Sequence, residues 1–192
     1  MILHYSGKYS GDENRLPQRE HPSNFVPFKE PKNMKQLALI SNVGCVITII
    51  LLGIPYLMLT VGQGEVRSIW NWGFPCAVLT LFPHELLHAI CFKKDVYLYT
   101  NFKQGLLFVV GTEDMSRGRF ILMSLLPNIV FGFLSYIIFL IHPPLTFLGS
   151  LGLLCVGMGF GDYINVFNAV RQVPHGAKIY LSGMHSYWYM DT

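Results

Sequence analysis

A His-Glu-x-x-His motif at residues 84–88 is the stretch of this chain best suited to chemistry. On a helix, positions four apart lie on one face, so His84 and His88 can bind one metal ion. Two neutral imidazoles with a carboxylate from elsewhere suit zinc and leave one position for the reaction. Glu85, beside the first histidine, can act as general base toward water. The motif therefore predicts a zinc hydrolase site; the alternative is a chance pattern on a buried helix.

The elements that carry this motif are apolar. Of the 192 residues 52% are hydrophobic and only 13% are charged, with a mean hydropathy of +0.40. Soluble domains carry about 25% charged residues, so the composition indicates a membrane protein. The net charge of +3 is small, and the basic residues flank apolar runs without forming a stripe, which argues against nucleic-acid binding. The four cysteines lie inside apolar runs and predict no disulfide framework.

Four apolar runs are long enough to cross a bilayer. They predict transmembrane helices at residues 37–60, 73–92, 118–141 and 145–170. Pro83 would kink or restart the second helix just before the motif. Two β-prone runs, residues 96–99 and 106–110, predict a hairpin between the second and third helices. That hairpin either caps the bundle or offers an edge strand to an extended peptide. The expected fold is an all-α integral membrane protein with about four spans and a small cytoplasmic β-hairpin.

Basic residues set the expected orientation. The first 36 residues carry six and residues 93–119 carry five, whereas the intervening loop carries only Arg67. The positive-inside rule then places both termini in the cytoplasm and the chain in the cell membrane as a multi-pass protein. We expect three segments: a polar, irregular cytoplasmic arm (1–36), a four-span domain with the metal site (37–170) and an interfacial cytoplasmic tail (171–192).

Ionisable residues inside a membrane are costly and usually functional. Within the expected spans these are His84, Glu85, His88 and Asp162. We predict His84, His88 and Asp162 as zinc ligands and Glu85 as the general base. Three amides at these depths could orient the site or merely pack helices: Asn128, Asn165 and Asn168.

Three short stretches carry a resemblance to a known family: residues 84–88, 161–165 and the tail at 173–177 and 186–189. Over residues 70–192 the chain resembles small bacterial membrane proteins labelled "putative zincin peptidase", formerly a domain of unknown function. It is similar, more distantly, to site-2 intramembrane metalloproteases. Those take two histidine ligands and the base from one membrane helix and an aspartate ligand from a later one. That pattern implies the same roles for His84, His88, Glu85 and Asp162, although site-2 proteases place the aspartate in an Asn-Pro-Asp-Gly-like context.

The predicted function is an integral-membrane zinc metalloprotease that hydrolyses peptide bonds at or within the membrane, near its cytoplasmic face. Its partners would be a peptide or membrane-protein substrate and the lipid bilayer, without nucleic acid; no signal indicates an oligomeric state. One alternative is a proton- or metal-coupled transporter, against which the lack of two similar halves argues. Another is a catalytically silent, metal-stabilised scaffold.

Overall fold

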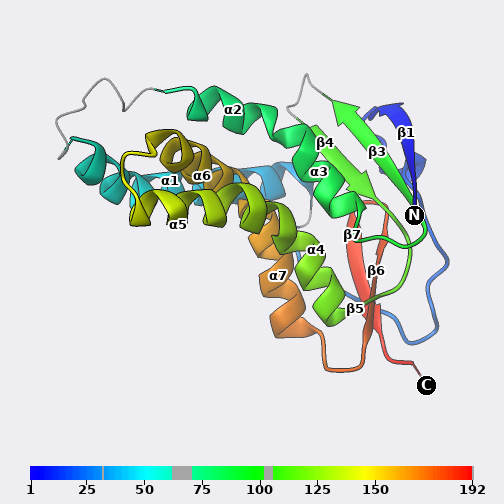
Figure 1. The fold of residues 1–192 in the computed structure, drawn as a ribbon. Helices are drawn as coiled ribbons and strands as arrows, with labels where there is room; N and C mark the ends of the chain where they lie inside the picture. The colour runs from blue at the N-terminus through cyan, green and yellow to red at the C-terminus, as the bar shows by residue number, and fades with distance from the viewer. Residues whose placement is uncertain (32, 62–70, 102–105, 192) are drawn as a thin grey trace. The chain divides into compact units, whose positions relative to one another are not determined.

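The structure is a computed structural model that describes residues 1–31, 33–61, 71–101 and 106–191. Helices occur together with strands that form two sheets (Figure 1). The all-α expectation is therefore wrong. The chain folds into two compact units, the first built from residues 1–30, 85–124 and 165–192 and the second from residues 31–84 and 125–164. These boundaries differ from the three segments expected from the sequence, whose functional division stays a prediction.

The first unit contains a three-stranded sheet in the order β1-β3-β4. Its strands are β1 (Ile2–Lys8), β3 (Asp95–Asn101) and β4 (Leu106–Val110). The antiparallel pair of β3 and β4 confirms the predicted hairpin. β1 lies parallel to β3, so the start of the N-terminal arm is ordered in a sheet and not irregular. The sequence did not predict this strand, because the arm is polar and rich in proline and because the partner strand lies some ninety residues further along the chain.

A second sheet in the same unit has the order β2-β7-β6-β5. Its strands are β2 (Val26–Pro27), β5 (Met115–Ser116), β6 (Lys178–Ser182) and β7 (His185–Tyr189). β6 and β7 form an antiparallel hairpin around Gly183, whose φ is +63°. A glycine opening a two-residue loop between β-prone runs is a hairpin signal. The C-terminal tail, which the sequence predicts to lie at the membrane–water interface, therefore forms two paired strands of a sheet.

The first unit has its own apolar core. Phe120 and Ile179, from a helix and a strand, are almost fully buried there with Ala89 and Phe92. Ala89 is the last residue of α3 (Leu81–Ala89), the helix that carries the metal motif. Packing of this end of α3 into the core holds His88 and Glu85 in a defined orientation within the unit.

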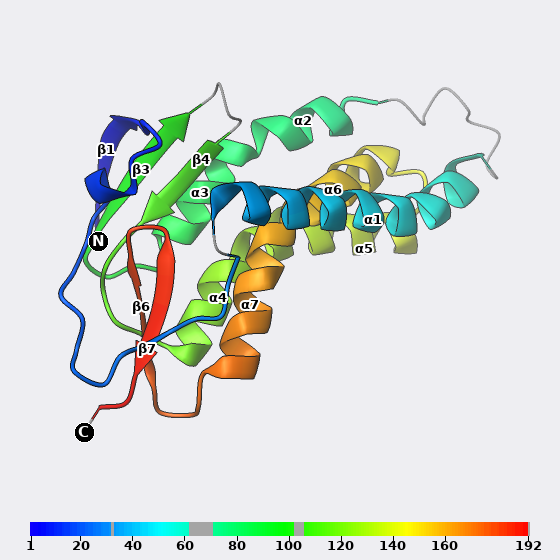
Figure 2. The same cartoon turned by 180° about the vertical axis from the view of Figure 1, so that it is seen from behind.

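The second unit is helical, and α1, α5 and α6 lie side by side in it (Figures 1 and 2). Its helices include α1 (Met34–Val61), α2 (Gly73–Leu79), η4 (Asn128–Phe133), α5 (Leu134–Ile141) and α6 (Thr146–Met158). α1 exposes its apolar side chains: Leu51 is 62% and Met58 70% exposed. An apolar surface of this extent suits contact with lipid or with another protein.

Two helical stretches of the described chain are long and apolar enough to cross a membrane. They are Lys35–Val61 and Arg117–Ile141, the latter running through α4 (Arg117–Pro127), η4 and α5. A third exists if α6 and α7 (Phe160–Gln172), which meet at a 53° bend, count as one span. The expectation of four spans is therefore wrong, because residues 73–92 form two short helices in place of a continuous one.

Candidate metal centre

The helix that carries the motif restarts just before it. α2 ends at Leu79 and α3 begins at Leu81; between them, the hydroxyl of Thr80 donates to the carbonyl of Ala77. Pro83 thus lies in the first turn of α3, where a missing N–H costs nothing. The backbone N–H of His84 donates to the Thr80 carbonyl at 2.8 Å. This local restart was predicted from Pro83, and it places His84 at a regular helical position.

His84, Glu85 and His88 form a compact group on α3. One ligand atom of each lies within 4.8 Å of the others. The helical rise carries His88 one turn beyond His84 on the same face, as the spacing requires. The group is half-buried, with His88 8% exposed. The two histidine nitrogens are donors that zinc accepts, and the carboxylate of Glu85 lies beside them.

The ring of His88 is oriented by a second contact. Its Nδ1 lies 2.8 Å from the backbone carbonyl oxygen of Met123. Because a carbonyl only accepts, Nδ1 is the donor, so in the neutral ring Nε2 is the nitrogen with a lone pair. A histidine held this way through its other nitrogen is how proteins commonly orient metal ligands. His88 is therefore prepared to bind a cation through Nε2.

Asp162, predicted from another helix, lies against His84 within the second unit. It occupies the first turn of α7, and its Oδ2 is 3.2 Å from His84 Nε2. Two ligand atoms each about 2.0–2.1 Å from a tetrahedral zinc lie at about this separation from each other. The side chains of His84 and Asp162 are both 16% exposed, so water has limited access to the pair. The donor types and their separation fit a zinc ion.

Asn128 positions Asp162. Its Nδ2 donates to Asp162 Oδ2 at 2.7 Å, and the residue is fully buried. The hydroxyl of Tyr163 donates to the other end of the same amide, Oδ1, at 3.4 Å, and to the carbonyl of Val156 at 3.0 Å. A Cβ on Gly159 would fall 1.6 Å from Asn128 Oδ1, so only glycine leaves room for the amide.

A π-helical segment, η4, begins at Asn128. Wider turns of this kind often occur at functional sites because they re-aim a side chain within a helix. The sequence leaves Asn128 as either an orienting or a packing amide, and its bond to Asp162 supports the orienting role. Tyr163 was missed; its place beside Asp162 in an apolar run was the available signal.

The other amides and histidines lie elsewhere. Asn168 is buried in the first unit and accepts from Gln172, which is packing within α7. Asn165 is half-buried on the same helix. His142 is exposed at the end of α5 in the second unit. The metal group of the described residues therefore excludes these side chains.

An ion pair between the buried Glu113 and the half-buried Arg119 holds the segment that follows α3. Glu113 accepts from the backbone N–H groups of Lys93 and Lys94 and from the guanidinium of Arg119. Burial alone would raise the pKa of Glu113, but these donors and the positive charge together lower it. Arg119 also donates to the Cys91 carbonyl at 2.8 Å. The carboxylate thus stays ionised and anchors the chain that follows the motif helix.

These features define a class: a protein with a His-Glu-x-x-His metal group on one helix and at least two helices apolar enough to cross a membrane. The chain belongs to the family described as "Putative zincin peptidase", whose model matches residues 77–178, just over half of its length. No curated protein and no solved structure matches the chain. Family and geometry are together compatible with a zinc-binding metallopeptidase.

Proposed function

We propose that this protein is an integral-membrane zinc metalloprotease that hydrolyses peptide bonds at or within the membrane, near the cytoplasmic face. The observation that carries the proposal is the group of His84, Glu85 and His88 within 4.8 Å, with Asp162 against His84. The site lies on a family-matched segment, which favours peptide hydrolysis over transport. The proposal names His84, His88 and Asp162 as the zinc ligands.

Each side chain then has a defined task. A zinc ion bound there would act as a Lewis acid, polarising the scissile carbonyl and favouring deprotonation of the attacking water. Glu85 accepts the proton from that water and delivers it to the nitrogen of the departing amine. Met123 and Asn128 hold His88 and Asp162 in place through their hydrogen bonds. Hydrolysis therefore needs no covalent enzyme intermediate.

The outer edge of β4 is the proposed binding place for an extended peptide. β4 is the last strand in the described order of its sheet. Val109 of β4 packs on the core cluster that contains Ala89 and Phe92, at the end of the motif helix. Gly111 lets the chain pass close to Phe92, since a Cβ there would meet the ring at 2.5 Å. Main-chain hydrogen bonds to such an edge bind peptides with little sequence demand.

The cytoplasmic placement rests on charge. Eleven of the fourteen Lys and Arg residues fall within the first unit, which joins the N-terminal arm, the loop after the motif and the C-terminal tail. These are the three segments that the positive-inside rule assigns to one side of the membrane. Their folding as one compact unit supports a common location for them. Both termini are accordingly proposed to be cytoplasmic.

The test compares purified wild type with Glu85→Gln, His84→Ala and Asp162→Ala, and with Asp95→Asn as a surface carboxylate control. Zinc per chain is measured by elemental mass spectrometry. Cleavage is measured in membranes suspended in ¹⁸O-water, because hydrolysis places the heavy oxygen in new C-termini. Glu85→Gln should keep about one zinc and lose about 100- to 10,000-fold in cleavage rate. The two ligand variants should lose both zinc and cleavage, and Asp95→Asn neither.

Two results would contradict the proposal. Zinc uptake into vesicles that requires a proton gradient, without new ¹⁸O-labelled termini, would indicate the transporter. Equal cellular function of wild type and Glu85→Gln, with zinc retained in both, would indicate the silent scaffold.

A further inference from the structure

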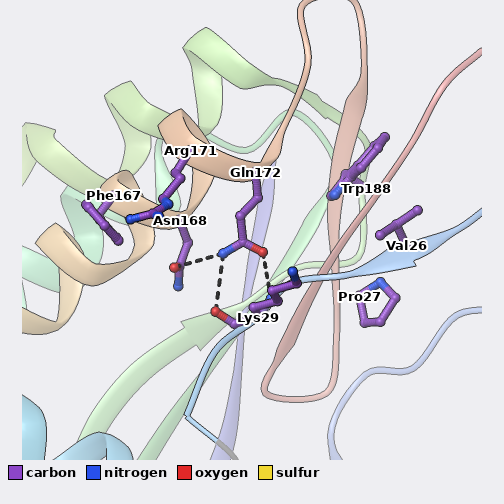
Figure 3. Close-up of a pocket in the computed structure, with 8 residues that line it drawn as sticks. All are labelled: Val26, Pro27, Lys29, Phe167, Asn168, Arg171, Gln172 and Trp188. Atoms are coloured by element: carbon purple, nitrogen blue, oxygen red, sulfur yellow. Dashed lines mark hydrogen bonds between the residues drawn. The ribbon is translucent and has the colours of Figure 1, made fainter.

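A pocket of about 550 Å³ lies in the first unit, apart from the metal group (Figure 3). It is formed where β2 and β7 meet the last turns of α7. The side chains that line it are Val26, Pro27, Lys29, Phe167, Asn168, Arg171, Gln172 and Trp188. The proposed protease chemistry uses none of them.

Hydrogen bonds of Gln172 hold one side of the pocket in place. The side-chain amide of Gln172 accepts from the backbone N–H of Lys29 at 2.7 Å and donates to its carbonyl at 3.2 Å (Figure 3). The same amide donates to Oδ1 of Asn168, a residue only 6% exposed, at 2.9 Å. These bonds join α7 to the segment between β2 and α1, so the backbone positions of Lys29 and Arg171 are set by the fold.

The charge of the pocket is uncompensated. Lys29 and Arg171 line it, and no carboxylate does. Among the described residues neither cation is in an ion pair, unlike Arg19 with Asp114 or Arg119 with Glu113 in the same unit. The guanidinium of Arg171 lies 5.7 Å from the ring centre of Phe167. Since the C-terminal end of a helix carries partial negative charge, the two side chains themselves must attract any anion.

The rim of the pocket is apolar. Phe167 is 58% and Val26 39% exposed, and the neighbouring Val170 is 52% exposed. Trp188 is half-buried, packing one side on the core and lining the pocket with the other. Cations adjoining exposed apolar side chains suit an amphiphile with an anionic head better than a free, fully hydrated anion.

The lining residues lie near the ends of membrane helices along the chain. Lys29 precedes Lys35, the start of a candidate span, by six positions, a reach of at most about 20 Å. Arg171 precedes Gln172, the residue at which the second helix of the bent pair Thr146–Met158 and Phe160–Gln172 ends. Tryptophan and basic side chains at such ends occur at headgroup depth.

We propose that this pocket binds the phosphate headgroup of an anionic phospholipid. Lys29 and Arg171 contact the phosphate, while Trp188 and Phe167 contact the glycerol backbone and the first acyl carbons. Basic pockets beside membrane helices bind anionic headgroups in this way. The bound lipid would fix the first unit against the membrane surface, a role beyond peptide hydrolysis.

The test uses the full chain in neutral detergent with Trp188 as its sole tryptophan, through Trp70→Phe and Trp72→Phe. Phosphatidylglycerol and phosphatidylcholine with identical brominated acyl chains are added, and quenching of Trp188 fluorescence is measured. Phosphatidylglycerol should quench at lower mole fraction. Lys29→Gln and Arg171→Gln should each weaken its binding about fivefold. The matched controls, Lys8→Gln and Lys94→Gln, each remove one charge from an exposed position and should change binding little.

Equal quenching by the two lipids, or equal loss in the Lys8→Gln and Lys94→Gln controls, would overturn the proposal. Displacement of phosphatidylglycerol by millimolar glycerol phosphate or inorganic phosphate would identify a soluble-anion site in its place. Circular dichroism of each variant checks folding. Zinc content and ¹⁸O incorporation are read separately, so a failure here is distinguishable from a failure of the protease assignment.

Discussion

Two carboxylates with restricted access to water, one in each unit, are held in different ways. Glu113 in the first unit, whose side chain is 3% exposed, is neutralised by Arg119 and receives two backbone N–H groups. Asp162 in the second unit is held by the neutral amide of Asn128 and faces the imidazole of His84. A guanidinium cancels a carboxylate's charge, whereas an amide orients the carboxylate and leaves the charge in place.

The comparison separates a structural carboxylate from one prepared for a cation. Burying an ion is costly unless it is paired, so each carboxylate needs a compensating positive charge. For Glu113 that charge is supplied by the protein itself, from Arg119. For Asp162 the proposed compensation is a metal ion shared with two histidines, which must be neutral to bind it.

Exchanging each carboxylate for its amide should separate the two roles most clearly. Asp162→Asn should lower zinc affinity by 100-fold or more and leave the melting temperature of the zinc-free protein nearly unchanged. Glu113→Gln should keep zinc but destabilise the fold by about 2 kcal/mol, because the half-buried Arg119 and the backbone N–H groups of Lys93 and Lys94 lose a charged acceptor. Chelator competition and thermal circular dichroism measure the two effects. If Glu113→Gln lost zinc while Asp162→Asn kept it, the comparison would be reversed.

Removing the orienting amide should have an intermediate effect. Asn128→Ala deletes the 2.7 Å bond to Asp162 without changing any charge. Loss of such a supporting bond typically weakens metal binding about 10- to 100-fold. Zinc affinity is measured against a fluorescent chelator, with Asn165→Ala on α7 as the amide control. Unchanged zinc affinity in Asn128→Ala would make Asn128 a packing residue only.

The pH dependence of stability should be the smallest effect and should belong to Glu113. Its folded-state pKa lies below the ordinary value of 4.5. The stabilisation is therefore complete above that value, declines as pH falls below it and is lost below the folded-state pKa. Thermal unfolding of wild type and Glu113→Gln between pH 7 and pH 3 measures this, and the stability difference between them should shrink toward the acid end. If the stability difference between the two proteins did not change with pH, groups other than Glu113 would account for the loss of stability of the wild type in acid.

Local patterns predicted much of the site. Helical spacing alone brought His84, Glu85 and His88 together, and Pro83 indicated the restart of α3. The run of β-prone residues around 96–110 predicted the hairpin that the structure contains. Asp162 was selected as a charge in an apolar run, and the structure places it against His84.

The sequence by itself determined what neighbouring residues control: the face shared by the motif side chains, the apolar stretches and the hairpin. The tertiary structure decided what distant segments control. β1 pairs with β3, His185 of β7 binds Glu30, a residue whose pKa burial raises, and Asn128 meets Asp162 because Gly159 leaves room. Backbone geometry sets the first group within a few residues. The second requires closing long loops, whose outcome depends on how the whole chain packs.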